Sequence, residues 1–273
     1  MARRQTNLSD ASTSSMAQAP AQPTAHRCHD YRLLAKRWKA FCRAAKLKIL
    51  PFARSAEEEI LVVTTGEQAA EAGEPWVYIS AGVHGDEAAP PWALLAWAEE
   101  HVELLRRHPF LIFPTMNPTG LILNTRADYA GMDLNRNFNH ASEPVVAAWR
   151  KVVEGRKIAL GLCLHEDYDG QGCYIYELNG GRQVLGQRIL ADTSAIIPPD
   201  HRPRIDGRAA KAGLIRRRVP PEMAGQPEAI VLHLLGAPIT LTFESPSEFG
   251  IVERIAVQKR FIESSLKHAL GFP

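Results

Sequence analysis

Two histidines and two glutamates stand where they could form a catalytic metal site. His84 and Glu87 follow one apolar run of the sequence, His165 closes a second, and Glu244 closes a third. Two imidazoles and one carboxylate leave the fourth position of a tetrahedral zinc ion open for water, which distinguishes a catalytic site from a closed structural one. The remaining carboxylate, Glu244, could take the proton of that water.

The individual spacings are weaker evidence than the set. The two-residue gap between His84 and Glu87 is also common in polar turns, and a lone histidine after a strand is more often a core residue than a ligand. His165 gains weight because its segment, Leu-Cys-Leu-His-Glu-Asp, passes abruptly from apolar to acidic residues. The metal-site hypothesis therefore depends on all these residues meeting in the fold.

The apolar pattern predicts an α/β fold. Predicted strands cover residues 59–65, 76–81, 110–113, 158–164, 174–178 and 238–243, and predicted helices cover residues 30–48, 90–107, 143–154, 182–191, 226–235 and 252–270. Because strands and helices alternate, we expect a mostly parallel or mixed central sheet with helices on both faces. His84, His165 and Glu244 fall just past predicted strand ends, where open α/β sheets bind ligands.

Other segments have simpler expectations. Residues 1–25 are rich in Ala, Ser, Thr, Gln and Pro and lack the apolar core of a secretion signal, so we expect a disordered segment. Residues 26–273 are expected to form a single catalytic domain. Pro51 is expected to end the first helix. Residues 197–213 are rich in Pro, Gly, Arg and Asp and are expected to form a long functional loop.

The composition is that of an ordinary globular protein. The chain of 273 residues is 45% hydrophobic and 23% charged, and its net charge of +2 is too small to indicate binding to nucleic acid or to a membrane surface. It has no run of 18 apolar residues, so no membrane span is predicted. The cytoplasm is the default location. The four cysteines form no Cys-x-x-Cys pair and are expected to be free, buried thiols.

Several further polar residues have two interpretations. Glu166, Asp167 and Asp169 are expected in a solvated acidic loop, with an acidic wall for a basic substrate as the alternative. His140 is expected to be a surface histidine, although it could contact substrate. The arginine run 216–218 is expected to be a solvated face, with a phosphate or polymer contact as the alternative.

The most specific segment is Asp-Leu-Asn-Arg-Asn-Phe at residues 133–138, preceded by Asn-Pro-Thr-Gly at residues 117–120 and by Arg126. With the His-x-x-Glu pair, the second histidine and the late glutamate, this order resembles the zinc metallocarboxypeptidase family typified by carboxypeptidase A. The resemblance covers roughly residues 59–250. It implies a carboxypeptidase-like fold.

The resemblance also implies a role for each residue of the metal site. His84, Glu87 and His165 would bind one zinc ion per chain, and Glu244 would act first as general base and then as general acid. Asp133 would accept the second N–H of His84 and fix its tautomer. A turn carboxylate is the alternative for Asp133.

Three more residues would handle the substrate. Arg126 would polarise the scissile carbonyl and stabilise the oxyanion, a contribution that dominates acyl-transfer catalysis. Asn135 and Arg136 would hold the terminal carboxylate of the substrate. A guanidinium fork fits a carboxylate bidentately, which a lysine ammonium does not.

Two features depart from the family. Carboxypeptidase A-like enzymes carry a tyrosine on a mobile loop between the second histidine and the late glutamate. Here Tyr168, Tyr174 and Tyr176 lie close behind His165, and no tyrosine occurs from residue 177 to 244. The stretch between Glu87 and His165 is also short for a digestive carboxypeptidase. With both features, the chain more closely resembles compact bacterial relatives, such as murein peptide amidases and the succinylglutamate desuccinylase and aspartoacylase group.

We therefore expect a zinc metallocarboxypeptidase that hydrolyses an amide bond beside a free carboxylate in a peptide. An N-acyl amino acid deacylase with the same zinc apparatus is the alternative enzyme. A zinc-bound recognition module without turnover is a third hypothesis, against which the presence of Glu244 argues. The expected partner is a small peptide or an acyl-amino acid, with no nucleic acid, no membrane and no predicted oligomeric state.

Overall fold

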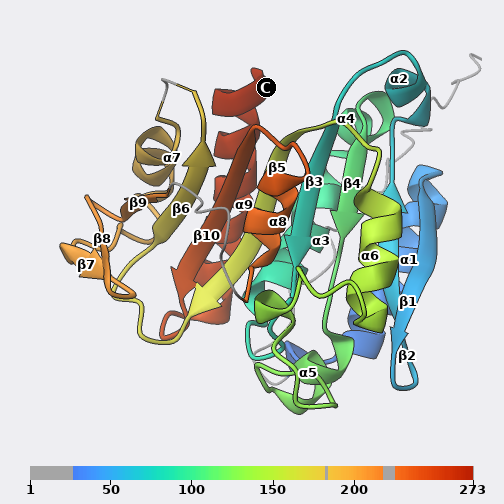
Figure 1. Ribbon diagram of the computed structural model, residues 1–273, viewed down its shortest axis with the longest axis horizontal. Coiled ribbons are helices and arrows are strands. Elements are labelled where there is room, and N and C mark those ends of the chain that lie inside the picture. The colour runs from blue at the N-terminus through green and yellow to red at the C-terminus, as the bar shows by residue number, and fades with distance from the viewer. Residues whose placement is uncertain (1–26, 182–183, 218–224, 273) are drawn as a thin grey trace, which may run out of the picture.

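An eight-stranded mixed sheet forms the centre of the protein, in the strand order β1-β2-β4-β3-β5-β10-β6-β9 (Figure 1). The structure is a computed structural model that describes residues 27–181, 184–217 and 225–272. The sheet strands are β1 (Lys48–Ser55), β2 (Glu58–Thr64), β3 (Trp76–Ala81), β4 (Phe110–Phe113), β5 (Ile158–Asp167), β6 (Tyr174–Asn179), β9 (Leu214–Arg216) and β10 (Ile239–Pro246). A separate hairpin pairs β7 (Arg204–Ile205) with β8 (Arg208–Ala209).

Helices cover both faces of this sheet (Figure 1). They are α1 (Tyr31–Ala45), α2 (Glu67–Glu71), α3 (Ala89–Glu100), α4 (Val102–Arg107), α5 (Pro118–Leu123), α6 (Pro144–Val153), α7 (Gly186–Thr193), α8 (Glu228–Leu234) and α9 (Ile251–Leu270). Strands β4, β3, β5 and β10 are parallel neighbours, whereas β1 and β2 pair antiparallel, as do β2 with β4 and β6 with β10. The predicted mixed α/β sheet with helices on both faces is confirmed.

The two sheet faces have separate cores. Helices α1, α3, α7 and α9 cover one face, over a core that includes Ile79, Leu162 and Phe243. Helices α6 and α8 cover the other, where Tyr78 and Cys163 belong to the core. Side chains alternate between the faces along each strand. This alternation decides which strand residues can reach the functional site.

Helix α1 shows how the sequence sets an element's limits. Asp30 caps the first turn by accepting the N–H of Leu33 at 2.9 Å. Leu34, Trp38 and Cys42 recur every four residues and are fully buried, so one stripe of the helix faces the core. The helix ends at Lys46, which has a left-handed backbone conformation.

Three local predictions were wrong in their limits. Pro51 lies within β1 rather than ending a helix; β1 is an edge strand, which tolerates a residue without an N–H donor. The helix predicted at 90–107 is divided into α3 and α4 at His101. The loop predicted at 197–213 contains the β7–β8 hairpin.

Other expectations fare differently. All four cysteines, Cys28, Cys42, Cys163 and Cys173, are buried and free, as predicted. The predicted disordered segment 1–25 and the start of the helix predicted at 182–191 lie outside the described residues. None of the helices in the described part of the chain has the length and apolar character needed to cross a lipid bilayer.

Candidate metal centre and substrate pocket

The loop between β3 and α3 presents His84 and is fixed by close backbone contacts. Gly82 has a φ of +61°, a conformation that favours glycine, and its carbonyl accepts the N–H of Asn117 at 2.8 Å. Gly85 packs directly on Gly120, because a Cβ at Gly85 would lie 1.9 Å from the carbonyl carbon of Gly120. The Asn-Pro-Thr-Gly segment thus buttresses the loop that carries the first histidine.

His165 and Glu244 come from neighbouring parallel strands. They are register partners on β5 and β10, so their side chains lie side by side on the sheet face that carries α6 and α8. The expectation that both residues follow a strand end was wrong, because β5 continues to Asp167 and β10 to Pro246. Pairing between these two strands extends past the apolar runs into polar residues.

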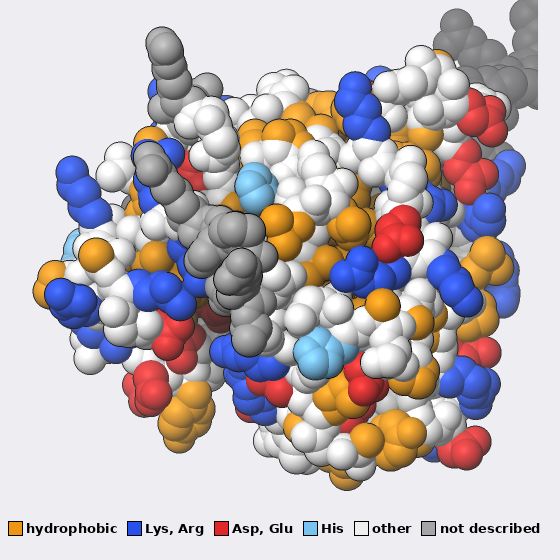
Figure 2. Space-filling model, in the orientation of Figure 1, with side chains coloured by type: hydrophobic (Ala, Val, Ile, Leu, Met, Phe, Trp, Pro, Cys, Tyr) orange, Lys and Arg blue, Asp and Glu red, His pale blue; other side chains and the backbone are white. Residues whose placement is uncertain are grey.

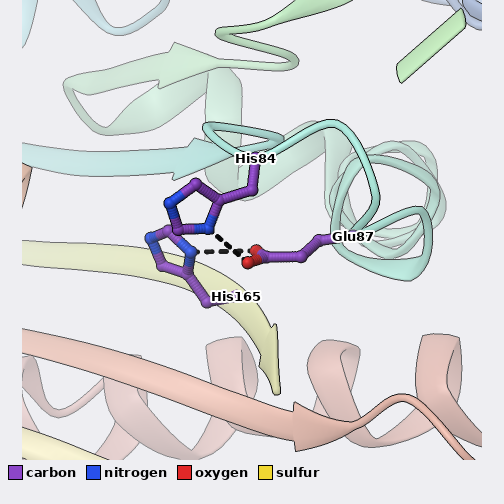
Figure 3. A group of neighbouring side chains, drawn as sticks. All are labelled: His84, Glu87 and His165. Carbon is purple, nitrogen blue, oxygen red and sulfur yellow. Dashed lines mark hydrogen bonds and ion pairs between the residues drawn. The ribbon is translucent and has the colours of Figure 1, made fainter. Parts of the chain in front are cut away.

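His84, Glu87 and His165 converge on one point (Figure 3). The Nδ1 atoms of both imidazoles hydrogen-bond to the Glu87 carboxylate, that of His165 at 2.9 Å. All three side chains are buried, and their ligand atoms lie within 4.8 Å of one another. The structure therefore brings together the three predicted ligands.

The charges of these groups support one another. Burial alone would raise the pKa of Glu87, but the two imidazoles hold it well below its usual range. Burial would likewise lower the pKa of His84, yet Glu87 and Asp133 raise it to about 9. Burial also acts to lower the pKa of His165, but the charge and hydrogen bond of Glu87, together with the charge of Glu244, raise it overall. The buried Glu87 carboxylate thus favours the protonated form of both imidazoles.

This donor set fits zinc. Two imidazole nitrogens and one carboxylate are one of the ligand sets found in catalytic zinc sites, and a buried, convergent arrangement keeps the ligands close to a common centre. The Nε2 atom of His84 is buried and makes no hydrogen bond within the described residues, and Asp133 Oδ1 lies 3.3 Å from it. Asp133 is therefore near enough to orient His84, as the sequence suggested.

Glu244 lies beside the three predicted ligands, as the register partner of His165. The side chain is partly exposed and lines the pocket. Burial raises the pKa of Glu244 to about 8, with nearby Glu87 and Asp167 raising it and His165 and Arg126 lowering it. A carboxyl group with a pKa near neutrality can both accept and return a proton.

Arg126 and Asp133 stand at the opening of the site. The Arg126 Nε donates to Asp133 Oδ2 at 2.9 Å, and its Nη1 lies 3.4 Å from His84 Nδ1. The Arg126 side chain is about half exposed. Its guanidinium is thus held next to the ligand cluster and still faces the pocket.

Asn135 and Arg136 line the same pocket on the short 3-10 helix η2 (Leu134–Arg136). The Asn135 Oδ1 accepts the N–H of Glu228 at 3.0 Å, which orients its amide and joins η2 to the start of α8. Arg136 is exposed, and its Nη1 donates to the carbonyl of Asn135. All eight residues predicted for the site are therefore near one another.

The pocket has a volume of about 540 Å³, which suits a small ligand. Tyr174 and Tyr176 of β6 line it, and the Tyr174 hydroxyl donates to Asp167 Oδ2 at 2.8 Å. Both tyrosines are on a strand, unlike the loop tyrosine of carboxypeptidase A-like enzymes. His140 is exposed, in line with the surface interpretation.

The solvated acidic loop expected at residues 166–169 was wrong for Glu166. This carboxylate is buried, accepts the N–H of Ala89 at 3.0 Å, and pairs with Arg254 at 3.0 Å. Because it follows His165 within β5, Glu166 points to the opposite sheet face. It joins α3 and α9 to the strand that carries the second histidine.

Sequence reasoning missed two features of the pocket. Glu228 is fully buried beneath it, and its carboxylate accepts hydrogen bonds from the Tyr78 hydroxyl and, at 2.6 Å, from Ser80 Oγ. No sequence signal marked it, since it looks like an ordinary first-turn helix residue. Arg217 lines the pocket although the run 216–218 was expected to be solvated. Because side chains alternate between the two sheet faces along β9, Arg216 and Arg217 point to opposite faces.

One family model matches part of the chain. Residues 74–159 match the model of the succinylglutamate desuccinylase/aspartoacylase catalytic domain. This segment contains β3, the His84 loop and η2, and it ends within β5. No curated protein matches the chain in sequence.

Several solved structures share the fold. A candidate metallopeptidase from Shewanella amazonensis SB2B aligns with a TM-score of 0.77 at 18% identity, covering 89% of this chain and 94% of that one. A metallo-carboxypeptidase from Burkholderia cenocepacia aligns with a TM-score of 0.66 at 19% identity, covering 87% and 69%. Carboxypeptidase A from Helicoverpa armigera aligns with a TM-score of 0.60 at 16% identity, covering 88% and 71%. The chain therefore has the carboxypeptidase-like fold and, over residues 74–159, resembles the succinylglutamate desuccinylase/aspartoacylase catalytic domain.

Proposed function

We propose that the protein is a zinc-dependent metallocarboxypeptidase that hydrolyses the amide bond beside a free carboxylate in a small peptide. The observation that carries this proposal is the buried convergence of His84, Glu87 and His165 next to an acid–base group, Glu244. Fold and partial family match both agree with a metal-dependent hydrolase. The predicted cytoplasmic location goes with this proposal.

The residues divide the chemistry among them. A zinc ion held by His84, Glu87 and His165 would act as a Lewis acid on the amide carbonyl and make a water molecule more acidic. Glu244 takes a proton from the attacking water and returns it to the leaving amine. Its partial exposure gives it access to the pocket, and its raised pKa suits both steps.

The substrate is held at two points. The guanidinium of Arg126 stabilises the negative charge that develops on the carbonyl oxygen, and its bond to Asp133 keeps it in place before substrate arrives. Asn135 and Arg136 bind the free carboxylate. The hydrogen bond from the N–H of Glu228 fixes the Asn135 carbonyl oxygen, which leaves the amide N–H₂ as the donor to substrate.

An N-acyl amino acid deacylase is the second candidate. The match of residues 74–159 to the succinylglutamate desuccinylase/aspartoacylase domain favours it, because the match includes His84, Glu87 and the Asn135–Arg136 segment. The pocket of about 540 Å³ admits either a short peptide or an acyl-amino acid. The two candidates use the same residues and differ in the group on the acyl side of the bond.

A mixed library distinguishes these functions. The zinc-loaded protein is incubated with short peptides and N-acyl amino acids, and the products are identified by mass spectrometry. Release of C-terminal amino acids from peptides supports the carboxypeptidase, whereas release from acyl-amino acids alone supports the deacylase. Absence of any product, with zinc bound at full stoichiometry, would contradict both and favour a recognition module. Glu244→Gln serves as the control for contaminating peptidases.

A further inference from the structure

A buried ion pair lies behind the candidate metal centre, on the opposite face of the sheet. The two carboxylate oxygens of Glu166, on β5, lie 3.0 and 3.1 Å from Nη1 of Arg254, on α9. Figure 2 shows Lys, Arg, Asp and Glu side chains spread over the surface of one face of the molecule. The Glu166 side chain, by contrast, is 0% exposed and that of Arg254 only 15%.

The stability of the fold does not give a sufficient reason for this pair. Taking two charges out of water costs free energy that their mutual attraction repays only when the geometry is favourable. Apolar side chains of similar size are often equally or more stabilising at such positions. The contacts that Glu166 makes with other parts of the chain therefore indicate another role.

The Glu166 carboxylate caps helix α3 from a distant strand. Its Oε2 accepts the N–H of Ala89, the first residue of α3, at 3.0 Å. The preceding Ala88 has no side-chain acceptor, and the next two residues are prolines, which have no N–H. The helix dipole also favours a negative charge at this end. Glu166 thus holds the start of α3 against β5.

Glu87 precedes this capped residue by two positions. Its carboxylate accepts hydrogen bonds from His84 and, at 2.9 Å, from Nδ1 of His165 (Figure 3). His165 directly precedes Glu166 in β5. Glu166 therefore connects, through short stretches of backbone, two candidate ligands that are 78 residues apart in the sequence.

Two further side chains extend these contacts. Gln258 of α9 donates through Nε2 to the carbonyl of His165 at 2.7 Å and to Ser245 Oγ at 2.9 Å. Ser245 follows Glu244 in β10 and is the register partner of Glu166. Its hydroxyl donates to Glu166 Oε1 at 3.4 Å. The polar contacts behind the sheet thus reach His165 itself and the residue after Glu244.

We propose that Glu166 is a positioning residue for the metal centre, which holds Glu87 against His165 in the arrangement that binds zinc. It acts through its hydrogen bond to the start of α3 and its place beside His165, and Arg254 keeps its carboxylate in place. This inference rests on the zinc site of the proposed function, but it does not depend on the substrate or on turnover.

The test replaces the ion pair by two apolar side chains of similar length. Glu166→Met/Arg254→Met removes both charges and should keep nearly the stability of the wild type in urea denaturation. It lacks the acceptor for the N–H of Ala89. We expect its zinc affinity, measured by competition with a chromogenic chelator, to fall by about tenfold to a hundredfold, as for other groups that orient metal ligands. The absorption spectrum of the Co²⁺-loaded protein should also shift, because it reports the arrangement of the ligands.

Arg37 and Glu99 supply the matched control. They form a second guanidinium–carboxylate pair, with Nη2 2.9 Å from Oε2, at the end of α3 away from Glu87. Arg37→Met/Glu99→Met makes the same two substitutions there and should leave the zinc affinity and the Co²⁺ spectrum unchanged. An equal loss in both double variants would show a general weakening of α3 and would overturn the positioning role.

The outcomes separate this inference from the proposed function. Wild-type zinc affinity and Co²⁺ spectrum in Glu166→Met/Arg254→Met would overturn it, since the pair would then serve the fold alone. If this variant does not fold, Glu166→Gln decides: a lower zinc affinity with a shifted Co²⁺ spectrum supports the inference, and unchanged values overturn it. A wild type that binds zinc but turns over no substrate refutes the hydrolase and leaves the affinity comparison valid. A wild type that binds no zinc overturns both.

Discussion

Glu244 stands beside His165 because the two residues are register partners in adjacent parallel strands. This pairing places the proposed proton acceptor next to a candidate metal ligand without any contribution from a flexible loop. The register that aligns the strands thus also aligns the acid–base group with the ligand cluster. Its precision depends on the sheet core, where Leu164 and Phe243 precede the two residues and are fully buried.

Glu244→Gln should retain the metal and lose most turnover. The substitution removes the proton acceptor without removing a ligand, and general acid–base groups contribute about 10²–10⁴-fold. Metal content is measured by atomic emission and turnover on the best library substrate. Rates near those of the wild type would show that another group acts as the base. His165→Gln is the complementary variant, because it should lose metal as well as activity.

The stability of the metal-free protein should fall as the pH rises from about 6.5 to 9. Glu87 and Asp133 raise the pKa of His84 to about 9, above its value in the unfolded chain, so the folded state binds the extra proton in this range. The stabilisation is complete below pH 6.5 and is lost through pH 9, and it amounts to as much as about 3 kcal/mol.

Urea denaturation of the chelator-treated protein at several pH values measures this dependence. His84→Asn should reduce the slope of the curve above pH 6.5, since it removes one titrating group; His165 and Glu244, whose pKa values are also raised, retain the rest of the dependence. Zinc binding requires the same imidazoles to be neutral, so the apparent affinity for zinc should rise over the same range. A metal-free protein whose stability rises with pH from 6.5 to 9 would contradict the charge arrangement around Glu87.

Much of the fold was predictable because its signals are local. The apolar run at β3 gave the limits Trp76–Ala81 correctly, and the cap at Asp30 agrees with the predicted first helix. The strand β1 was missed because a proline usually interrupts regular secondary structure. The strand tolerates Pro51 because β1 lies at the edge of the sheet. Local pattern does not show which strand is at an edge.

The site was predictable in its members and less so in its surroundings. His84, Glu87 and His165 occur in a fixed order along the chain, and two histidines with one glutamate suggest few kinds of site other than a metal site. Glu166 was expected to be solvated because it stands in an acidic stretch of the sequence. Its partner, Arg254, lies on α9, 88 residues later in the chain, and local composition does not show that the two residues pair. Arg217 depends equally on long-range pairing, since only β9 decides which residue of the arginine run enters the pocket.

Glu228→Ala should destabilise the protein and weaken substrate binding. The carboxylate is fully buried and accepts hydrogen bonds from Tyr78 and Ser80, so its loss leaves two buried donors unsatisfied. Each unsatisfied donor costs about 1–3 kcal/mol. Because the N–H of Glu228 holds Asn135, movement of the α8 start should also raise KM more than it lowers kcat.

Glu228→Gln is the matched control, since its amide oxygen can still accept one of the two bonds. It should lose less stability than Glu228→Ala in urea denaturation, with an intermediate KM. If both variants have the stability of the wild type, the buried network contributes nothing measurable to the fold. An unchanged KM in a destabilised Glu228→Ala protein would show that the buried hydrogen bonds of Glu228 do not determine the position of Asn135.

Arg136→Lys should lose much of its discrimination for a free carboxylate. Arg136 is exposed at the pocket, and its Nη1 donates to the carbonyl of Asn135, which leaves other guanidinium N–H groups to face substrate. A lysine keeps the charge but cannot form the bidentate fork. The expected loss is one charge-assisted contact, roughly 1.5–3 kcal/mol, or about tenfold to a hundredfold in kcat/KM.

The measurement compares the free-acid and amidated forms of one active substrate in the wild type and in Arg136→Lys. The wild type should strongly prefer the free acid, and the variant should lose rate on the free acid with little change on the amide. Equal turnover of both forms by the wild type would mean that the enzyme does not bind a terminal carboxylate. The carboxypeptidase assignment would then fail. Metal-dependent hydrolysis through His84, Glu87 and His165 would remain, because neither these residues nor Glu244 depend on carboxylate binding by Arg136.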